Sequence, residues 1–271
     1  MIKVLQPEGH VRRPAVAGRF YPADPTELRR RVESFLREAG PADAPAPKAI
    51  IVPHAGYVYS GPIAASAYAR WAPARDAIKR VVMFGPSHHA SFKGLAAPDD
   101  GAFATPLGMV RVDTAAIRDL RSHLPQVIVL REAHAGEHAL EVHLPFLQCV
   151  LADFKIVPLL VCDARDEEVA EVIEALWGGD ETRFVISSDL SHYYDYASAR
   201  ELDTVTARAI EELRPQDIDM EQACGRVPIR GFLRVAERHR LRARTVDLRN
   251  SGDTAGPPSE VVGYGAWVFE E

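Results

Sequence analysis

Five apolar runs of strand length, separated by segments with helical spacing, constrain the fold of this chain most. The apolar runs are residues 48–54, 80–87, 154–161, 182–189 and 261–269. Segments with helical spacing lie between most of them, at residues 62–72, 114–124, 167–177 and 201–213. Continuous apolar runs, unlike alternating ones, are typical of strands that are buried on both faces. We therefore expect an α/β fold, with a largely parallel or mixed sheet covered by helices on both faces.

One domain is expected over the whole chain, residues 1–271. No internal repeat, low-complexity tract or shift of composition after residue 48 suggests a second one. Residues 1–48 are expected to form an arm, a helix and a Pro-rich connector that pack on this domain. Asp24 and Pro25 are typical of a helix start, and Gly40 is typical of a helix end.

The charge of the chain excludes some classes of partner. The formal net charge is -6, whereas binding to nucleic acid depends on clustered Lys and Arg that neutralise phosphates. No stretch approaches the ~20 apolar residues that span a membrane, and the N-terminus lacks the apolar core of a signal peptide. We expect a cytoplasmic protein that binds neither nucleic acid nor membrane. The sequence does not indicate its oligomeric state.

Polar side chains that bind metals follow three of the expected strands. His54 follows the first, His88 and His89 follow the second, and Asp189 and His192 follow the fourth. The carboxyl ends of parallel strands meet at one edge of a sheet, where ligands of such folds bind. Neutral imidazole is the commonest metal ligand, and catalytic metal sites typically use three protein ligands. The pattern therefore predicts a metal site at this edge.

An anionic ligand would complete such a site, and the sequence offers several. The candidates are Asp189, Asp253, Glu137, Glu141 and the thiolate of Cys224. Cys149 and Cys162 lie within apolar runs, where a small buried sulfur needs no further explanation. Cys224 precedes Gly225 at an apparent helix break, where a thiol can be exposed and ionised. A packing cysteine is the alternative interpretation of Cys224.

The segment "HAGEHALEVH" contains three histidines. His134 and His138 have the spacing that lets two imidazoles share a metal on one helix face, but Gly136 lies between them. The HExxH and HxxEH motifs are both absent, which disfavours a zincin-type hydrolase. Glu141 and His143 either line the pocket or belong to an ordinary amphipathic helix start.

The segment "SSDLSHYYD" suggests a proton-transfer pair. Asp189 and His192 are three residues apart, which is close enough for the carboxylate to orient the imidazole as a general base. A helix cap followed by an incidental histidine is the alternative. Signatures of nucleotide binding and of serine hydrolysis, such as GxGxxG, GxxxxGK[ST] and GxSxG, are absent from the chain.

Seven motifs, taken in order, resemble one known family. They are "PAVAGRFYP", "VPHAGYVYSG", "GPSHH", "EHALEVHLPFL", "SSDLSHY", "ACGRVPI" and the closing "NSGD...VVGYGAWVF". In this order they resemble the Memo family, also known as protein B of the AmmeMemoRadiSam system, from about residue 13 to the C-terminus. The resemblance implies a fold like that of the catalytic subunit of class III extradiol dioxygenases, which hold non-haem Fe(II) at a site open to O2.

The resemblance also implies a set of site residues. His54, His89 and Cys224 would bind the metal, and His192, beside Asp189, would act as the base. Further side chains expected around the metal or in the substrate pocket are His88, Glu141, His143, Tyr57 and Asp253. Fe(II) is the expected metal. Copper and zinc are the alternatives, because a thiolate replaces the carboxylate of the dioxygenases and is a softer ligand.

We therefore expect a metal-dependent oxidoreductase with a small-molecule or peptide substrate that the sequence does not identify. Fold alone does not establish this activity. A metal-independent adaptor that binds a peptide or protein in the same pocket is one alternative, with Tyr57, Tyr59 and Tyr193 available for recognition. A metallohydrolase is a second alternative.

Overall fold

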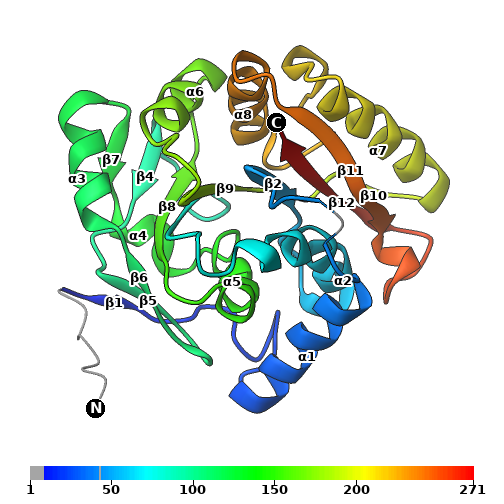
Figure 1. The fold of residues 1–271 in the computed structure, drawn as a ribbon. Helices are drawn as coiled ribbons and strands as arrows, with labels where there is room; N and C mark the ends of the chain where they lie inside the picture. The colour runs from blue at the N-terminus through cyan, green and yellow to red at the C-terminus, as the bar shows by residue number, and fades with distance from the viewer. Residues whose placement is uncertain (1–8, 43) are drawn as a thin grey trace.

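The computed structural model describes residues 9–42 and 44–271. They form an α/β fold around one twelve-stranded mixed sheet, in the order β1-β5-β6-β8-β3-β9-β2-β12-β10, with β4, β7 and β11 paired beside this path (Figure 1). The central strands are β8 (Lys155–Val161), β3 (Arg80–Pro86), β9 (Thr182–Ser187) and β2 (Ala49–Val52). Neighbours among these four pair in parallel. The expected fold class is confirmed.

Antiparallel and mixed strands extend the parallel centre on both sides. On one side are β12 (Val261–Glu270), β11 (Arg242–Asn250) and β10 (His192–Tyr194). On the other side are β6 (Gly108–Val112), β5 (Ala102–Thr105), β1 (Val11–Arg12), β4 (Leu95–Ala97) and β7 (Val127–Val129). The last apolar run of the chain, in β12, is antiparallel to β2. The sheet is therefore mixed, with a parallel core.

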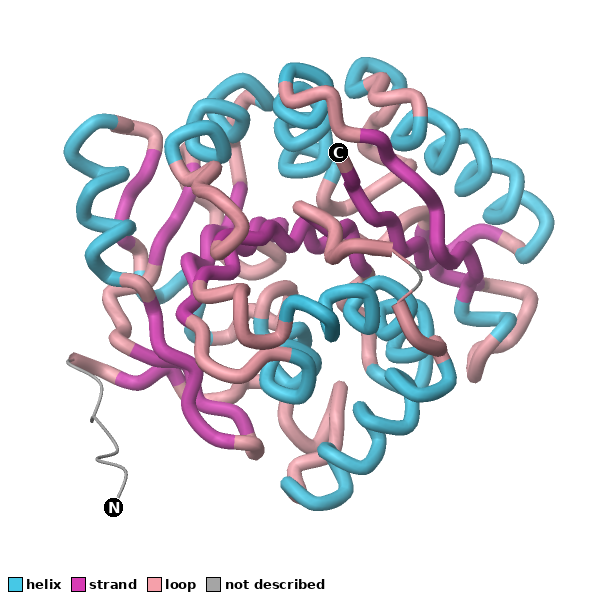
Figure 2. Tube along the Cα trace, viewed as in Figure 1, coloured by secondary structure: helices cyan, strands magenta, loops and turns pink. Residues whose placement is uncertain are grey.

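Helices cover both faces of the sheet, as expected. The α-helices are α1 (Pro25–Glu38), α2 (Tyr57–Tyr68), α3 (Thr114–His123), α4 (Arg131–Ala135), α5 (Leu144–Val150), α6 (Asp166–Ala175), α7 (Tyr196–Glu211) and α8 (Arg226–Arg238). Short 3-10 helices are η1 (Ala69–Ala74), η2 (Glu141–His143), η3 (Pro215–Asp217) and η4 (Ser251–Asp253). Helices α6, α7 and α8 lie on one side of the central strands and α1, α2 and α5 lie on the other (Figures 1 and 2).

The first helix begins and ends where local sequence signals place it. The Asp24 carboxylate accepts a hydrogen bond from the backbone N–H of Glu27 at 2.8 Å, and Pro25 occupies the first turn. The chain leaves the helix through Gly40, whose φ of 77° is readily adopted only by glycine.

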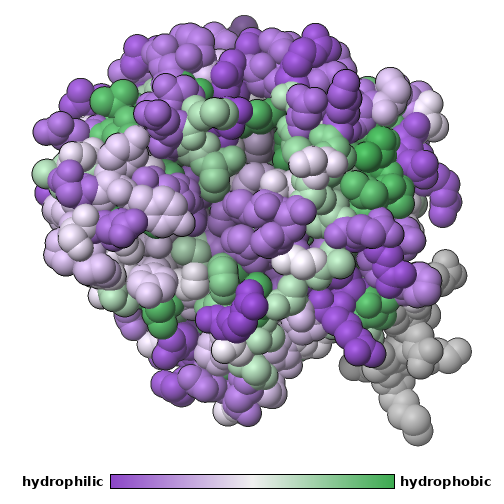
Figure 3. Space-filling model, turned by 180° about the vertical axis from the view of Figure 1, so that it is seen from behind, coloured by the Kyte–Doolittle hydropathy of each residue, from purple (hydrophilic) through white to green (hydrophobic). Residues whose placement is uncertain are grey.

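The core lies between the sheet and its two helical layers. Every residue of β2 and of β9 is buried, which explains the continuous apolar runs in the sequence. Among the described residues, no helix combines the length and the apolar character that a membrane crossing requires. Figure 3 shows hydrophilic side chains over much of the face opposite to that of Figure 1, with smaller hydrophobic patches among them.

Candidate metal centre

The histidines that follow the central strands meet at the carboxyl edge of the sheet. The ring centroids of His54 and His88 are 5.1 Å apart, although the two residues follow different strands, β2 and β3. His138, from the loop between α4 and η2, completes the cluster. Its ring lies 5.5 Å from that of His54 and 4.7 Å from that of His88. The parallel core thus brings together side chains that are distant along the chain.

Within the described part of the chain, two groups of side chains could each hold a metal ion. One consists of His54, His88 and His138, and the other of His89, Glu137 and His138. In each group the ligand atoms all lie within 4.8 Å of one another. The two groups share His138, so the edge presents one continuous cluster of metal-binding side chains.

The ligand set implied by the family resemblance, His54, His89 and Cys224, is distributed around this cluster. His54 belongs to the first group, His89 to the second and Cys224 to neither, but the Cys224 Sγ lies 3.4 Å from the His54 Nε2. The geometry favours His88 over His89 as the partner of His54. Adjacent residues in a turn point in different directions, and the sequence does not indicate which of them faces inward. Metal binding by this set remains a prediction.

His54 is held rigidly below the surface. Its side chain is 2% exposed, its Nδ1 lies 2.7 Å from the Ser187 hydroxyl, and its backbone N–H donates to the Asp189 carboxylate at 2.7 Å. Burial, reinforced by the neighbouring histidines His88 and His138, lowers the pKa of His54 well below its usual value. The ring is therefore neutral at neutral pH, which is the form that binds metals.

His88 is oriented by a buried carboxylate. The two oxygens of Glu137 accept hydrogen bonds from the His88 ring at Nδ1 (2.9 Å) and from its backbone N–H (2.6 Å). Burial alone raises the pKa of Glu137, but the hydrogen bonds and charge of His88, with backbone N–H groups, outweigh it and lower this pKa to about 2. Burial lowers the pKa of His88, but its hydrogen bond and its attraction to Glu137 outweigh this and raise the pKa.

Cys224 lies at the start of α8, beside the end of β9. Its Sγ accepts a hydrogen bond from the backbone N–H of Asp189 at 3.3 Å. A Cβ added to the neighbouring Gly225 would lie 2.5 Å from the Ser187 carbonyl oxygen, so only glycine permits this close approach. Burial, and the charge of Asp189, raise the pKa of Cys224 to about 12. Without a bound cation the thiol is protonated, and a bound cation would favour the thiolate.

The expected hydrogen bond between Asp189 and His192 is replaced by other contacts. The Asp189 carboxylate accepts from the His54 backbone, and the His192 Nδ1 lies 2.7 Å from the carbonyl oxygen of Leu190. A carbonyl only accepts hydrogen bonds, so His192 carries its proton on Nδ1 and leaves Nε2 free. His192 is therefore oriented by the backbone of its own turn. Its role as a base remains a prediction.

Glu141 and Tyr57, which we expected to line the pocket, have structural contacts. The buried Glu141 carboxylate forms an ion pair with Arg12 and accepts hydrogen bonds from the backbone N–H of Val16 and the Tyr21 hydroxyl. It therefore anchors the N-terminal arm, which corrects the expectation. The Tyr57 hydroxyl donates to the backbone at 2.6 Å, and the ring is buried in the core.

His143 and Asp253 also have defined contacts. The His143 Nε2 lies 2.8 Å from the Ser187 hydroxyl, which also contacts the His54 ring. Asp253 is exposed in η4, where its carboxylate accepts from the Tyr196 hydroxyl at 2.6 Å and caps the local turn. These contacts place His143 in support of the cluster and Asp253 in a surface turn.

His138 is the cluster residue that the sequence pattern obscured. Its spacing from His134 suggested one helix face, but α4 ends at Ala135 and the chain is not helical at His138. His134 instead turns inward, with its Nε2 2.9 Å from the Ala96 carbonyl oxygen. The sequence signal that could have identified His138 is its position directly after Glu137, which was already a candidate anionic ligand.

Comparison with known proteins identifies the family of this chain. The family model of Memo-like proteins matches residues 12–268. A MEMO1 family protein of Aquifex aeolicus is 36% identical over 96% of this chain and 99% of its own length. Similar proteins of Ignicoccus hospitalis and Methanothermobacter thermautotrophicus are 37% and 36% identical, over 96% and 94% of this chain and 98% of each relative. The chain therefore belongs to the Memo-like family.

Proposed function

We propose that this protein is a metal-dependent oxidoreductase whose metal binds at the carboxyl edge of the sheet. The observation that carries the proposal is the convergence of His54, His88 and His138, from three separate segments, with their ligand atoms within 4.8 Å of one another. Like imidazoles packed together gain little from one another, whereas a shared cation would stabilise all three.

The donor atoms fit a transition metal. His54 and His88 would supply imidazole nitrogens and Cys224 a thiolate, with His138 beside them as a further ligand. Nitrogen and sulfur donors suit Fe(II), copper and zinc and disfavour magnesium and calcium. If three of these four side chains bind the metal at once, a position is left for a substrate or O2, and a redox-active metal would supply electron transfer. We propose Fe(II) first and copper second.

The other side chains at this edge would prepare the substrate. His192, whose Nε2 is free, would accept a proton from a small-molecule or peptide substrate, and its bond to Leu190 would keep the ring in place. The Asp189 carboxylate supports the backbone of His54. This assignment makes His192 a proton acceptor and Asp189 a positioning residue.

A peptide-binding adaptor is a second candidate function, because aromatic side chains are exposed beside the cluster. Tyr193 is 72% exposed and its ring lies 5.7 Å from that of His192. Tyrosines with an apolar body and a polar tip are frequent in recognition surfaces. Binding to a peptide partner that survives removal of metal would favour this function over the oxidoreductase.

Metal loading tests the proposal directly. Anaerobically purified protein is loaded separately with Fe(II), Cu(I) and Zn(II), and bound metal and O2 consumption are measured. The wild type should bind one equivalent, whereas His54→Ala and Cys224→Ala should lose it, with His239→Ala as a control away from the cluster. Unchanged occupancy in both site variants would overturn the proposal. Activity with zinc in the absence of O2 would indicate a hydrolase instead.

A further inference from the structure

The hydroxyl of Ser187, the last residue of β9, lies between two histidine rings. Its Oγ is 2.7 Å from the His54 Nδ1, 2.8 Å from the His143 Nε2 and 2.6 Å from the carbonyl oxygen of Ala139. A serine hydroxyl has one proton to donate and two lone pairs that accept. Since the Ala139 carbonyl can only accept, the serine proton must point to it.

The direction of that one proton determines the tautomer of both rings. The Ser187 oxygen has only lone pairs left, so His54 must donate from Nδ1 and His143 from Nε2. A neutral imidazole carries a single N–H, and His54 therefore keeps its lone pair on Nε2. This is the nitrogen 3.4 Å from the Cys224 sulfur. Among the described residues, the remaining nitrogen of His143, Nδ1, is buried without a partner, which is consistent with a nitrogen that carries no proton.

Glu137 acts on His88 in the same sense. Its carboxylate is acceptor-only when ionised, and it accepts from the His88 Nδ1 at 2.9 Å. Both of its oxygens are also held by backbone N–H groups, those of His88, His138 and Ala139 at 2.6–2.9 Å, so the carboxylate cannot easily turn away. The neutral His88 ring therefore carries its proton on Nδ1 and its lone pair on Nε2.

We propose that Ser187 and Glu137 are positioning residues that lock His54 and His88 in the Nδ1–H tautomer, so that both Nε2 lone pairs are available to one metal ion. Neither residue is a metal ligand in this assignment. The hydrogen bonds that set the two tautomers involve no metal. Only the use of these tautomers, metal binding, rests on the proposed function. The serine ends β9, the glutamate lies in the loop after α4, and both side chains are buried.

The wild-type protein provides the first test. The full chain is labelled with nitrogen-15 at histidine, treated with a chelator, and studied by long-range nitrogen–proton NMR at a pH where the rings are neutral. We expect His54 and His88 to show a protonated Nδ1 and an unprotonated Nε2, and His143 to show the opposite tautomer. Protonation of His54 or of His88 at Nε2 would overturn the proposal.

Variants provide the second test. Ser187→Ala and Glu137→Ala should each let the facing ring exchange tautomers and should weaken binding of Fe(II) or Zn(II) by about 10- to 100-fold, as losses of such outer partners do. Ser187→Thr, which keeps a hydroxyl, should restore the tautomer and most of the affinity. Glu174→Ala is the matched control for Glu137→Ala, because Glu174 pairs with His239 at 2.9 Å away from the cluster. Unchanged tautomers in both alanine variants would refute the lock.

The two proposals fail in different ways. If the tautomers are as assigned but no metal binds, the lock stands and the proposed function fails. If metal binds but His54 or His88 has the other tautomer, the proposed function stands and the lock fails. The wild-type NMR measurement decides even if an alanine variant does not fold.

Discussion

Polar groups have different partners at the two edges of the central sheet. At the amino edge, the Lys48 ammonium donates to the carbonyl oxygens of Trp177, Gly179 and Thr182 at 2.8–3.1 Å. At the carboxyl edge, imidazole rings face one another and a thiol. The first arrangement pairs a donor with acceptors and stabilises the fold, whereas the second brings like groups together. The contrast supports the proposal that the carboxyl edge binds a ligand, whereas the contacts at the amino edge stabilise the fold.

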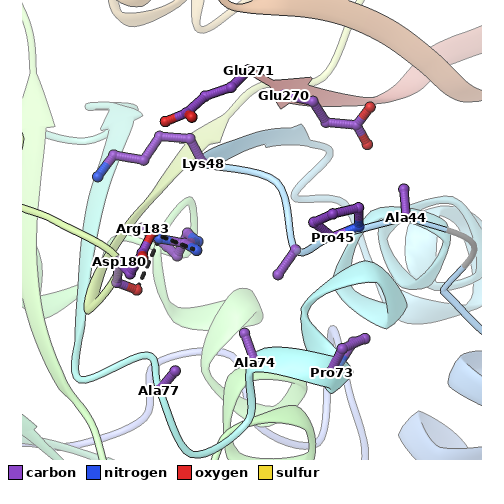
Figure 4. A pocket seen from close by; sticks show the side chains of 11 residues that line it. Ala44, Pro45, Lys48, Pro73, Ala74, Ala77, Asp180, Arg183, Glu270 and Glu271 are labelled. Atoms are coloured by element: carbon purple, nitrogen blue, oxygen red, sulfur yellow. Dashed lines mark hydrogen bonds and ion pairs between the residues drawn. The ribbon is translucent and has the colours of Figure 1, made fainter.

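A cavity does not by itself mark the functional edge. A pocket of about 560 Å³ opens at the amino edge, lined by Lys48, Arg183 and Glu270 among others (Figure 4). Its charged side chains have opposite signs, and the Arg183 guanidinium already donates to the Asp180 carbonyl oxygen at 2.9 Å. The two groups of side chains that could hold a metal ion lie at the other edge. The types of side chain at each edge therefore distinguish the two edges better than the volume of a pocket does.

The largest expected effect comes from Glu141, which lies four residues from Glu137 but serves the fold. Glu141→Ala should lower the free energy of unfolding by about 3–5 kcal/mol, because it leaves the Arg12 guanidinium buried without its partner. Denaturant unfolding measures this, with Glu132→Ala on the exposed face of α4 as a control. A decrease in the free energy of unfolding of less than about 1 kcal/mol would contradict the structural role that separates Glu141 from Glu137.

At the amino edge, Lys48→Met should destabilise the protein by about 3 kcal/mol, because hydrogen bonds of a charged donor contribute about 1.5–3 kcal/mol and several carbonyls lose their donor. Metal affinity at the carboxyl edge should not change. Lys79→Met, at an exposed lysine, is the control. If Lys48→Met weakened metal binding as strongly as a ligand variant does, the two edges would not be independent.

At the carboxyl edge, the opposite pattern is expected. Cys224→Ser should weaken binding of Fe(II) or copper on the order of 100-fold, because a hydroxyl is a poor ligand for softer metals, a loss of roughly 2.7 kcal/mol. The metal-free variant should unfold within about 1 kcal/mol of the wild type. Titration calorimetry and denaturant unfolding test both halves, with Cys162→Ser as a control. A large loss of metal-free stability with unchanged affinity would assign Cys224 to packing.

The smallest effect concerns pH. Burial raises the pKa of Asp203, on α7, to about 6, against its ordinary value of 3.8. The folded state therefore favours the protonated carboxyl, so this contribution to stability is complete below about pH 4 and is lost as pH rises through about 6. Between about pH 4 and pH 6 the loss is about 1 kcal/mol for each pH unit. Asp203→Asn should flatten that part of the wild-type stability profile. An identical slope in both proteins would contradict the assignment.

The sequence anticipated the location of the site better than its contacts. Apolar runs that end in histidine predicted one edge, and His54 and His88 do meet there, together with His138, which the sequence pattern did not place. The family resemblance implied His89 as the ligand, whereas the structure places His88 beside His54; two adjacent residues in a turn carry no signal in the sequence for which of them faces inward. It paired Asp189 with His192 because they are close along the chain, whereas the carboxylate bonds to His54, 135 residues away.

The sequence by itself determined the α/β class, the edge at which the histidines gather and the family, since strand length, apolar continuity and motif order are local properties. Only the tertiary structure decided which side chains face one another. In the folded chain, His138 lies beside His54, and the Ser187 hydroxyl contacts the rings of His54 and His143. Glu141 forms an ion pair with Arg12. The physical reason is that a side chain's direction at the end of a strand, and hence its partner, depends on packing between segments far apart in the sequence.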